Sequence, residues 1–223
     1  METLIQVFFN LDIAAKVWPH LLRGFGTTLM LSALVIPLGI AGGLALALAS
    51  THRSCLVRGA IVVYVDFFRA FPPLVLLIFI YFGFPFLSIE MPKLTAVALG
   101  FFLNTSSYYG EILRAGIESI GRGQMDAGLS MGLTRKQAYR YIIVPQAVKN
   151  VLPDLVGNTL EVIKLTTLAS VVALPELLNN ARQAQALTYN ATPIVLAALL
   201  YLALLWPIVR LMSRLEHQHL ARR

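Results

Sequence analysis

The sequence predicts an all-α integral membrane protein with five transmembrane helices, organised as one membrane domain over residues 1–223. Two properties of the chain lead to this prediction. Hydrophobic residues make up 57% of the 223 positions and charged residues only 13%, about half the charged share that a soluble domain carries. The apolar residues are also grouped into runs long enough to cross a bilayer, for which a helix needs roughly 20 residues. These five runs cover residues 27–49, 57–82, 94–115, 151–174 and 193–212.

The first run, residues 27–49, carries no charge. It ends in small residues that imitate a signal-peptidase site, but a signal h-region is shorter, so we expect a retained span. Gly39 and Gly43 match a small-residue pairing motif, for which we favour packing within the chain. Before this run, residues 4–18 alternate apolar and polar side chains and predict a short helix on the outer membrane surface, anchored by Trp18.

The second run, residues 57–82, is interrupted by Pro72 and Pro73. Two prolines remove two backbone donors, so we expect a kinked or broken helix at this point. Carbonyls freed at membrane depth must be buried in protein or face a cavity. Broken helices of this kind recur at transport sites.

Lys and Arg are distributed unequally between the segments that connect the runs. With the N-terminus outside, the outer segments hold four basic residues, and Arg69 and Lys164 lie within spans. The other twelve lie inside, so the positive-inside rule places residues 116–150 and the C-terminus in the cytoplasm. A small outer helix is expected within residues 175–192. The inner residues are Arg53, Arg58, Arg114, Arg122, Arg135, Lys136, Arg140, Lys149, Arg210, Arg214, Arg222 and Arg223.

Four charges fall within spans, in two pairs of equal spacing: Asp66 with Arg69, and Glu161 with Lys164. At i, i+3 each acid and base share a helix face. Each pair falls about ten residues, or roughly 15 Å, into its span. Two interpretations stay open: the pairs neutralise each other and lock the bundle, or they line a path that matches both charges of a zwitterion. Glu111, near the inner end of the third run, is a further candidate for a ligand, structural or gating role.

Residues 116–150 form a polar, basic segment inside this apolar chain. We predict two short helices that meet at Gly132. Thr134 is expected to cap the second helix, and Pro145 to limit its regular hydrogen bonding.

The segment resembles the cytoplasmic coupling loop of bacterial ABC importer permeases, whose pattern is Glu-Ala-Ala, three residues, then Gly. Asp126 stands at the Glu, Gly128 at the second Ala, and Val144-Pro145 at a later Leu-Pro. Three further segments are similar to the polar amino acid subfamily (histidine, glutamine, arginine and opine importers), and the resemblance covers roughly residues 20–215. They are Phe68–Val75, Tyr109–Ile120, and Ile163–Ser170 with Pro175-Glu176-Leu177.

The resemblance implies a permease subunit in the bacterial inner membrane that translocates a polar amino acid. Its implied partners are two copies of an ATP-binding ABC subunit, a second permease, identical or paralogous, a periplasmic amino-acid-binding protein, and membrane lipid. Candidate residues for ATPase coupling are Gln124, Asp126, Ala127, Gly128, Gly132, Arg135 and Pro145. Candidate residues of the substrate path are Asp66, Arg69, Glu111, Glu161, Lys164 and Thr167.

The chain departs from the subfamily beside this path, at Ala70, Phe71 and Leu165, where Gly, Thr and Asp are usual. Two of these changes remove polar groups. A pocket adapted to an unusual or partly apolar amino acid would explain them, and so would an asymmetric partner that supplies the polar contacts. Which amino acid or opine is carried stays open.

Other function classes find little support in the sequence. No Gly-x-x-x-x-Gly-Lys-Ser/Thr phosphate loop occurs, so ATP hydrolysis is expected on a separate subunit and the chain itself is not expected to be an enzyme. The single cysteine, Cys55, and four scattered histidines predict no disulfide, catalytic site, metal site or cofactor. The net charge of +7 shows no nucleic-acid pattern and suits inner-leaflet loops. The alternative is an ion-coupled secondary transporter or a channel, which would explain the charges within spans but not the coupling-loop spacing.

Overall fold

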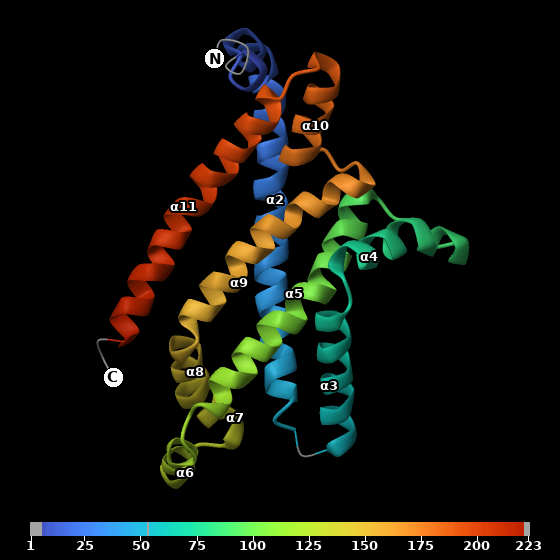
Figure 1. The fold of residues 1–223 in the computed structure, drawn as a ribbon. Helices are drawn as coiled ribbons and strands as arrows, with labels where there is room; N and C mark the ends of the chain where they lie inside the picture. The colour runs from blue at the N-terminus through green and yellow to red at the C-terminus, as the bar shows by residue number, and fades with distance from the viewer. Residues whose placement is uncertain (1–5, 53, 221–223) are drawn as a thin grey trace. The chain divides into compact units, whose positions relative to one another are not determined.

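A computed structural model describes the backbone of residues 6–52 and 54–220, and the side chains as far as residue 213. All regular structure in these residues is helical, which confirms the predicted all-α class (Figure 1). Residues 4 and 5 of the predicted surface helix, and Arg53, Arg222 and Arg223 of the inner basic set, lie outside them. The helices are α2 (Leu11–Ala49), α3 (Cys55–Ala70), α4 (Pro73–Ile78), α5 (Lys93–Glu118), α6 (Arg122–Ser130), α7 (Arg135–Ala138), α8 (Val144–Asn150), α9 (Leu152–Leu165), α10 (Leu177–Thr188) and α11 (Thr192–Leu220). Two π-helices, η1 (Phe79–Gly83) and η3 (Tyr139–Ile143), and two 3₁₀ helices, η2 (Phe84–Leu87) and η4 (Thr166–Val172), continue α4, α7 and α9.

The chain divides into two compact units. The first contains the described residues of Met1–Ile36, Pro73–Phe101 and Leu160–Leu211, and the second contains those of Pro37–Pro72, Phe102–Thr159 and Met212–Arg223. Helices α2, α5, α9 and α11 each contribute residues to both units.

Three helices of the described chain are long and apolar enough to cross a membrane: Gln6–Ala49, Leu152–Val172 and Thr192–Ser213. The number rises to four if Cys55–Ala70 and Pro73–Leu87, which meet at a bend of 99°, form one broken span. This bend confirms the break predicted from the two prolines. The predicted third span lies in α5, whose middle holds polar side chains buried in the protein. The count of five spans stays a prediction.

The beginning of the chain differs from the predicted surface helix. Helix α2 is continuous from Leu11 to Ala49 and joins the expected surface segment to the expected span. Its start is fixed by Asn10, whose side-chain oxygen accepts the backbone N–H groups of Asp12 and Ile13 at 3.0 and 3.1 Å. Val17 and Leu21 pack in the core of the first unit, whereas Phe8, Leu11 and Trp18 are exposed, so the position of this segment on the membrane surface stays a prediction.

The core of the first unit joins α2 to α10 and α11, and the predicted small helix within residues 175–192 is confirmed as α10. Glu176 is the N-cap of α10 and is fully buried. Its carboxylate accepts the backbone N–H of Leu178 at 2.8 Å and of Asn179 at 2.6 Å, and the hydroxyl of Tyr201 donates to it at 3.1 Å. Burial raises the pKa of the Glu176 carboxyl above its ordinary value, although both N–H bonds oppose the shift.

In the second unit, α2 and α5 approach each other through glycine. A Cβ on Gly43 would lie 2.6 Å from the Cβ of Tyr109 and 2.7 Å from the backbone nitrogen of Gly110, and one on Gly39 would lie 2.5 Å from the hydroxyl of Thr105. No side chain fits at such distances, so glycine is required for this contact. The interpretation of the Gly39/Gly43 motif as internal packing is confirmed.

Candidate functional site

The break after α3 leaves two carbonyls without their helical donors. In a continuous helix the carbonyls of Phe68 and Arg69 would accept the N–H groups four residues on, but those positions are Pro72 and Pro73. Two side chains of α5 supply the missing donors. The Asn104 amide donates to the Phe68 carbonyl at 3.0 Å, and the Tyr108 hydroxyl donates to the Arg69 carbonyl at 3.4 Å. We call this pair of hydrogen bonds the α5 clamp.

The Arg69 side chain also turns toward α5. Its guanidinium lies 3.9 Å from a Glu111 carboxylate oxygen and 5.6 Å from the centre of the Tyr108 ring. Glu111 is in turn bound by Arg114 at 2.7 Å, and Arg114 contacts Glu118 at 2.5 Å. The charges therefore alternate along α5 and up to the end of α3.

This arrangement corrects the expected pairing of Asp66 with Arg69. Arg69 sits in the last turn of α3, beside the break, where Glu111 and Tyr108 of α5 are within its reach. Asp66 is exposed and takes part in no ion pair with the residues whose side chains are described.

The second expected pair does form, in the first unit. Lys164 donates to Glu161 at 2.6 Å, on one face of α9, with 53% and 67% of the respective side chains exposed. Thr167 follows in η4, where its hydroxyl donates to the Lys164 carbonyl at 2.8 Å.

The polar loop has the predicted turn at Gly132. Helix α6 ends at Ser130, and Gly132 has φ of +83°, the left-handed conformation that favours glycine. The N–H of Leu133 then closes onto the carbonyl of Gly128 at 3.1 Å, as in a Schellman helix end. Thr134 caps α7 in a reciprocal box with Gln137, which confirms the predicted N-cap.

Pro145 limits regular hydrogen bonding as predicted, although it does not end the helix. It occupies the first turn of α8, and the preceding π-helix η3 lets the N–H of Val144 reach back five residues to Tyr139. The second helix of the loop is therefore one irregular helix from Arg135 to Asn150. Gln146 adds a contact between the two arms, because its amide donates to Gln124 at 3.4 Å.

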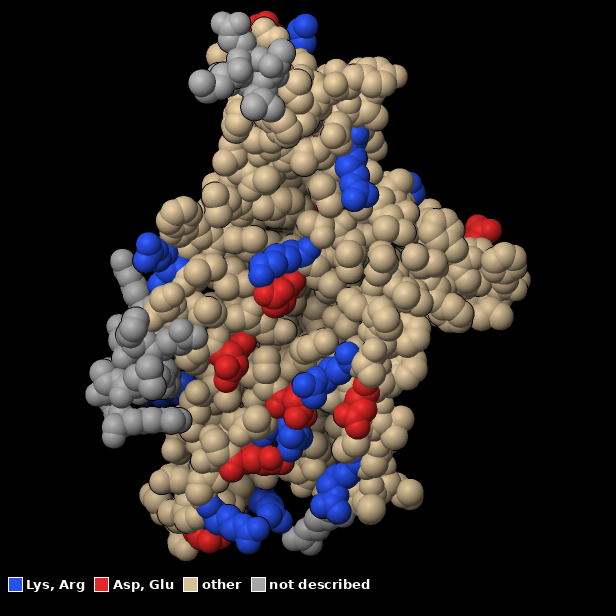
Figure 2. All heavy atoms as spheres, in the orientation of Figure 1, with Lys and Arg blue, Asp and Glu red and all other residues tan. Residues whose placement is uncertain are grey.

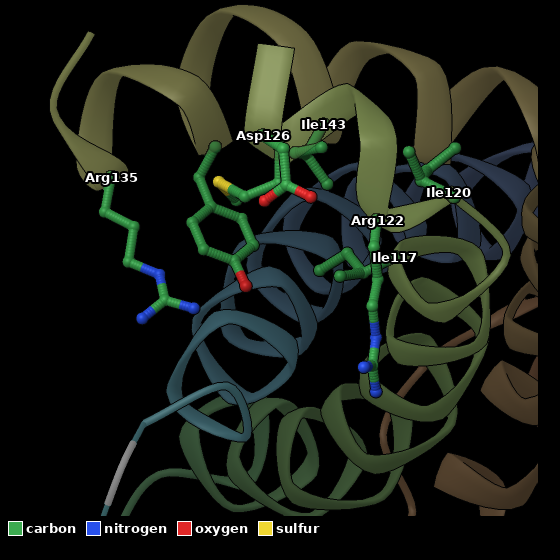
Figure 3. A pocket seen from close by; sticks show the side chains of 9 residues that line it. Ile117, Ile120, Arg122, Asp126, Arg135 and Ile143 are labelled. Carbon is green, nitrogen blue, oxygen red and sulfur yellow. The ribbon is translucent and has the colours of Figure 1, made fainter. Parts of the chain in front are cut away.

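A cavity of about 550 Å³ lies between the end of α5, α6 and the α7–η3 segment. Figure 3 shows the side chains of Arg122 and Arg135 on its two sides, with the carboxylate of Asp126 between them. Figure 2 shows blue Lys and Arg side chains gathered where this loop lies, on a surface that is mostly tan.

Of the other expected coupling residues, Ala127 is exposed and Gly128 is buried. A Cβ on Gly128 would lie 2.8 Å from the Ile142 side chain.

Sequence reasoning missed Asn104 and Tyr108. A signal for them exists: two adjacent prolines identify Phe68 and Arg69 as the residues with orphaned carbonyls, and such groups need a donor from elsewhere in the protein. What the sequence does not carry is the tertiary contact that brings α5 to these carbonyls.

An all-helical apolar chain with a broken span, charged side chains on the predicted spans and a basic two-helix loop defines a helical transport protein of the membrane. Residues 36–218 match the family described as "Binding-protein-dependent transport system inner membrane component". The chain belongs to this family.

Relatives with curated descriptions are permeases. The chain is 36% identical over 200 residues to "Probable amino-acid ABC transporter permease protein YckA" of Bacillus subtilis (strain 168), covering 89% of this chain and 88% of that one. It is 31% identical over 201 residues to the arginine transport system permease protein ArtQ of the same organism, covering 87% and 91%. A solved amino acid ABC transporter with histidines superposes with a TM-score of 0.82 at 32% identity, over 92% of this chain and 96% of that one. The MetNI methionine ABC transporter, at 20% identity and a TM-score of 0.74 over 87% and 94%, shares the fold.

Proposed function

We propose that this chain is the permease subunit of an ATP-driven importer that carries a polar amino acid across the bacterial inner membrane. The observation that carries the proposal is the loop of residues 116–150. It has a left-handed Gly132, a capped α7 and an exposed Asp126. The relatives of the chain include one named as a probable amino-acid ABC transporter permease and one named as an arginine transport system permease. Binding of a separate ATPase to this loop would couple ATP hydrolysis to transport.

We further propose five crossings, with the N-terminus in the periplasm and the C-terminus in the cytoplasm. The distribution of Lys and Arg supports this orientation, and the bent α3–α4 pair would form the second crossing. Reporter fusions along the chain test it and should read in, out, in, out, in. A sixth crossing, or an outside signal in the loop, would contradict the proposed coupling. Suitable fusion points follow Thr51, Ile89, Gly121, Gln185 and Ser213.

The proposed partners follow from this assembly: two copies of the ATP-binding subunit, a second permease of identical or paralogous sequence, and a periplasmic amino-acid-binding protein. For the ATPase contact we propose Gln124, Asp126, Ala127, Gly128, Gly132, Arg135 and Pro145. Co-purification of the permease with an ATPase subunit encoded beside it tests the contact. Wild-type ATP-dependent uptake in a variant that no longer retains the ATPase would refute it.

For the substrate path we propose Asp66, Arg69, Glu111, Glu161, Lys164 and Thr167. Their mixed charges suit a zwitterion. The Glu161–Lys164 pair is more than half exposed on a predicted span, so variants of either residue are compared at matched protein levels, which separates a loss of transport from a loss of folding.

Uptake by Glu161→Gln, Lys164→Gln and the double variant, at matched protein levels, separates the two open roles of this pair. If Glu161 receives the substrate ammonium, Glu161→Gln loses uptake and the double variant does not recover it. Recovery in the double variant would show that the two charges only neutralise each other, and would remove both from the substrate path.

A further inference from the structure

A second cavity, of about 440 Å³, lies in the second unit between the end of α2 and the helix that starts at Arg135. It is distinct from the cavity that holds Asp126 and Arg135, with which it shares only the Tyr139 side chain. The residues that line it are Leu44, Leu48, Thr51, Lys136, Tyr139, Arg140 and Val144.

The wall of this cavity is apolar on the α2 side. Leu44 and Leu48 are one helical turn apart, so they share a face, and Val144 adds a further aliphatic side chain from α8. Helix α2 is also one of the apolar helices long enough to cross a membrane, and several large side chains along it are exposed. Ile40, one turn before Leu44 on the same face of α2, is also exposed, so the apolar face extends beyond the cavity.

The opposite side of the cavity is cationic. Lys136 and Arg140 are four residues apart, both are exposed, and neither is in an ion pair with a described side chain. The Arg140 guanidinium lies 5.8 Å from the centre of the Tyr141 ring. No acidic residue is among the described residues that line the cavity.

We propose that this cavity binds an anionic glycerophospholipid. Lys136 and Arg140 would pair with the phosphodiester, and Leu44, Leu48 and Val144 would contact the first part of the acyl chains. Basic pockets beside a transmembrane helix on the cytoplasmic side are suited to anionic headgroups, and a soluble anion would gain nothing from the aliphatic wall. The choice of the inner leaflet rests on the proposed orientation, whereas the lipid class rests on the cavity alone.

The test measures lipid retention rather than transport, so its readout does not depend on uptake. It uses the assembled complex and in that respect rests on the proposed function. The full transporter complex is purified in detergent, mixed with phosphatidylglycerol or phosphatidylcholine, and analysed by native mass spectrometry for bound lipid. The wild-type complex should retain phosphatidylglycerol in preference to phosphatidylcholine. Lys136→Gln/Arg140→Gln should weaken this retention about thirtyfold, since each cation near a membrane surface contributes about a factor of five.

Two controls separate a built site from bulk charge. Arg58→Gln/Lys149→Gln also removes two exposed cations, but neither residue lines the cavity, so retention should be unchanged. Lys136→Arg/Arg140→Lys keeps both charges and should keep the lipid, which also guards against a fold that fails to tolerate the glutamines.

Three results would overturn the proposal. The first is equal retention of the two lipids, or an equal loss in the Arg58/Lys149 control. The second is full displacement of the lipid by deacylated glycerophosphoglycerol at the same concentration, which would make the ligand a soluble phosphodiester. The third is unchanged lipid retention in Lys136→Gln/Arg140→Gln with loss of the ATPase subunit, which would assign this surface to a protein contact.

Discussion

The α5 clamp predicts that Asn104 stabilises the protein more than its neighbours on the same helix. Asn104→Leu removes the amide and keeps a similar volume, so the Phe68 carbonyl loses the donor that Pro72 cannot replace. Asn104 is only 5% exposed, and its bond to the Phe68 carbonyl is partly buried. A hydrogen bond of this kind contributes about 0.5–1.5 kcal/mol net, and we expect Asn104→Leu to lower the free energy of unfolding by that amount.

The neighbouring residue provides a matched control. The Thr105 hydroxyl is buried and has no hydrogen-bond partner among the described residues. Thr105→Val removes this hydroxyl at constant shape, in the same helix and at similar burial, and should be neutral or stabilising. Tyr108→Phe should cost less than Asn104→Leu, because its bond is longer, at 3.4 Å, and Tyr108 is 37% exposed.

The assay is unfolding of the purified permease by a denaturing detergent, followed by circular dichroism, in parallel with uptake. A restored donor offers an internal check. Phe71 has an extended backbone in the wild type. Pro72→Ala restores a backbone N–H that reaches the Phe68 carbonyl once α3 continues through Phe71, so Asn104→Leu should be less destabilising in a Pro72→Ala background. Equal stability of Asn104→Leu and Thr105→Val would refute the clamp as an energetic feature.

Three further predictions concern other parts of the chain. Gly132→Asp, forced into a left-handed conformation that costs about 1–2 kcal/mol, should abolish ATPase association and uptake but not membrane insertion. Gly123→Asp adds the same charge to open space on α6 and should keep both ATPase association and uptake. Equal uptake by the two variants would contradict a requirement for the left-handed turn at Gly132. Since folding raises the pKa of Glu176, its contribution to stability is complete below the unfolded value of about 4.3 and is lost as pH rises through the folded value. Thermal unfolding from pH 4 to 8 should show this fall in the wild type and not in Glu176→Gln. In Gly43→Ala the new methyl would lie 2.7 Å from a backbone nitrogen of α5, which should lower the free energy of unfolding by about 1–3 kcal/mol. Gly59→Ala places its methyl in open space and should leave the free energy of unfolding unchanged. Denaturing-detergent titration of both variants measures the difference.

Local chemistry in the sequence predicted the loop and the broken helix well. Pro72 and Pro73 act on the hydrogen bonds of their own helix, and Gly132 and Thr134 act within one turn of their own positions, so their effects do not depend on the rest of the fold. The continuous α2 could not be predicted in the same way, because the polar residues near its start suggested a membrane surface. Val17 packs in a core with α10 and α11, a tertiary contact that the sequence pattern does not show.

The partner of Arg69 shows why charge pairs within one helix are poor guides to an ion-pair network. Spacing by three residues brings Asp66 and Arg69 onto one face, but the same spacing holds for Glu111 and Arg114 on α5, and the structure connects the two helices instead. A sequence can list the charges that share a face. The acid that pairs with an arginine in the last turn of a helix depends on which other helix packs beside that turn.

This network changes which candidate residues we expect to bind substrate. Glu111 already has Arg114 at 2.7 Å and Arg69 at 3.9 Å, so a substrate ammonium would have to compete with two guanidinium groups for its carboxylate. Asp66 has no such competitor among the described side chains, and Glu161 has one exposed lysine. Of the three acids, Asp66 and Glu161 are therefore the better acceptors for an ammonium. Glu111, bound on both sides and on the same helix as Asn104 and Tyr108, is better suited to hold Arg69 at the end of the broken helix.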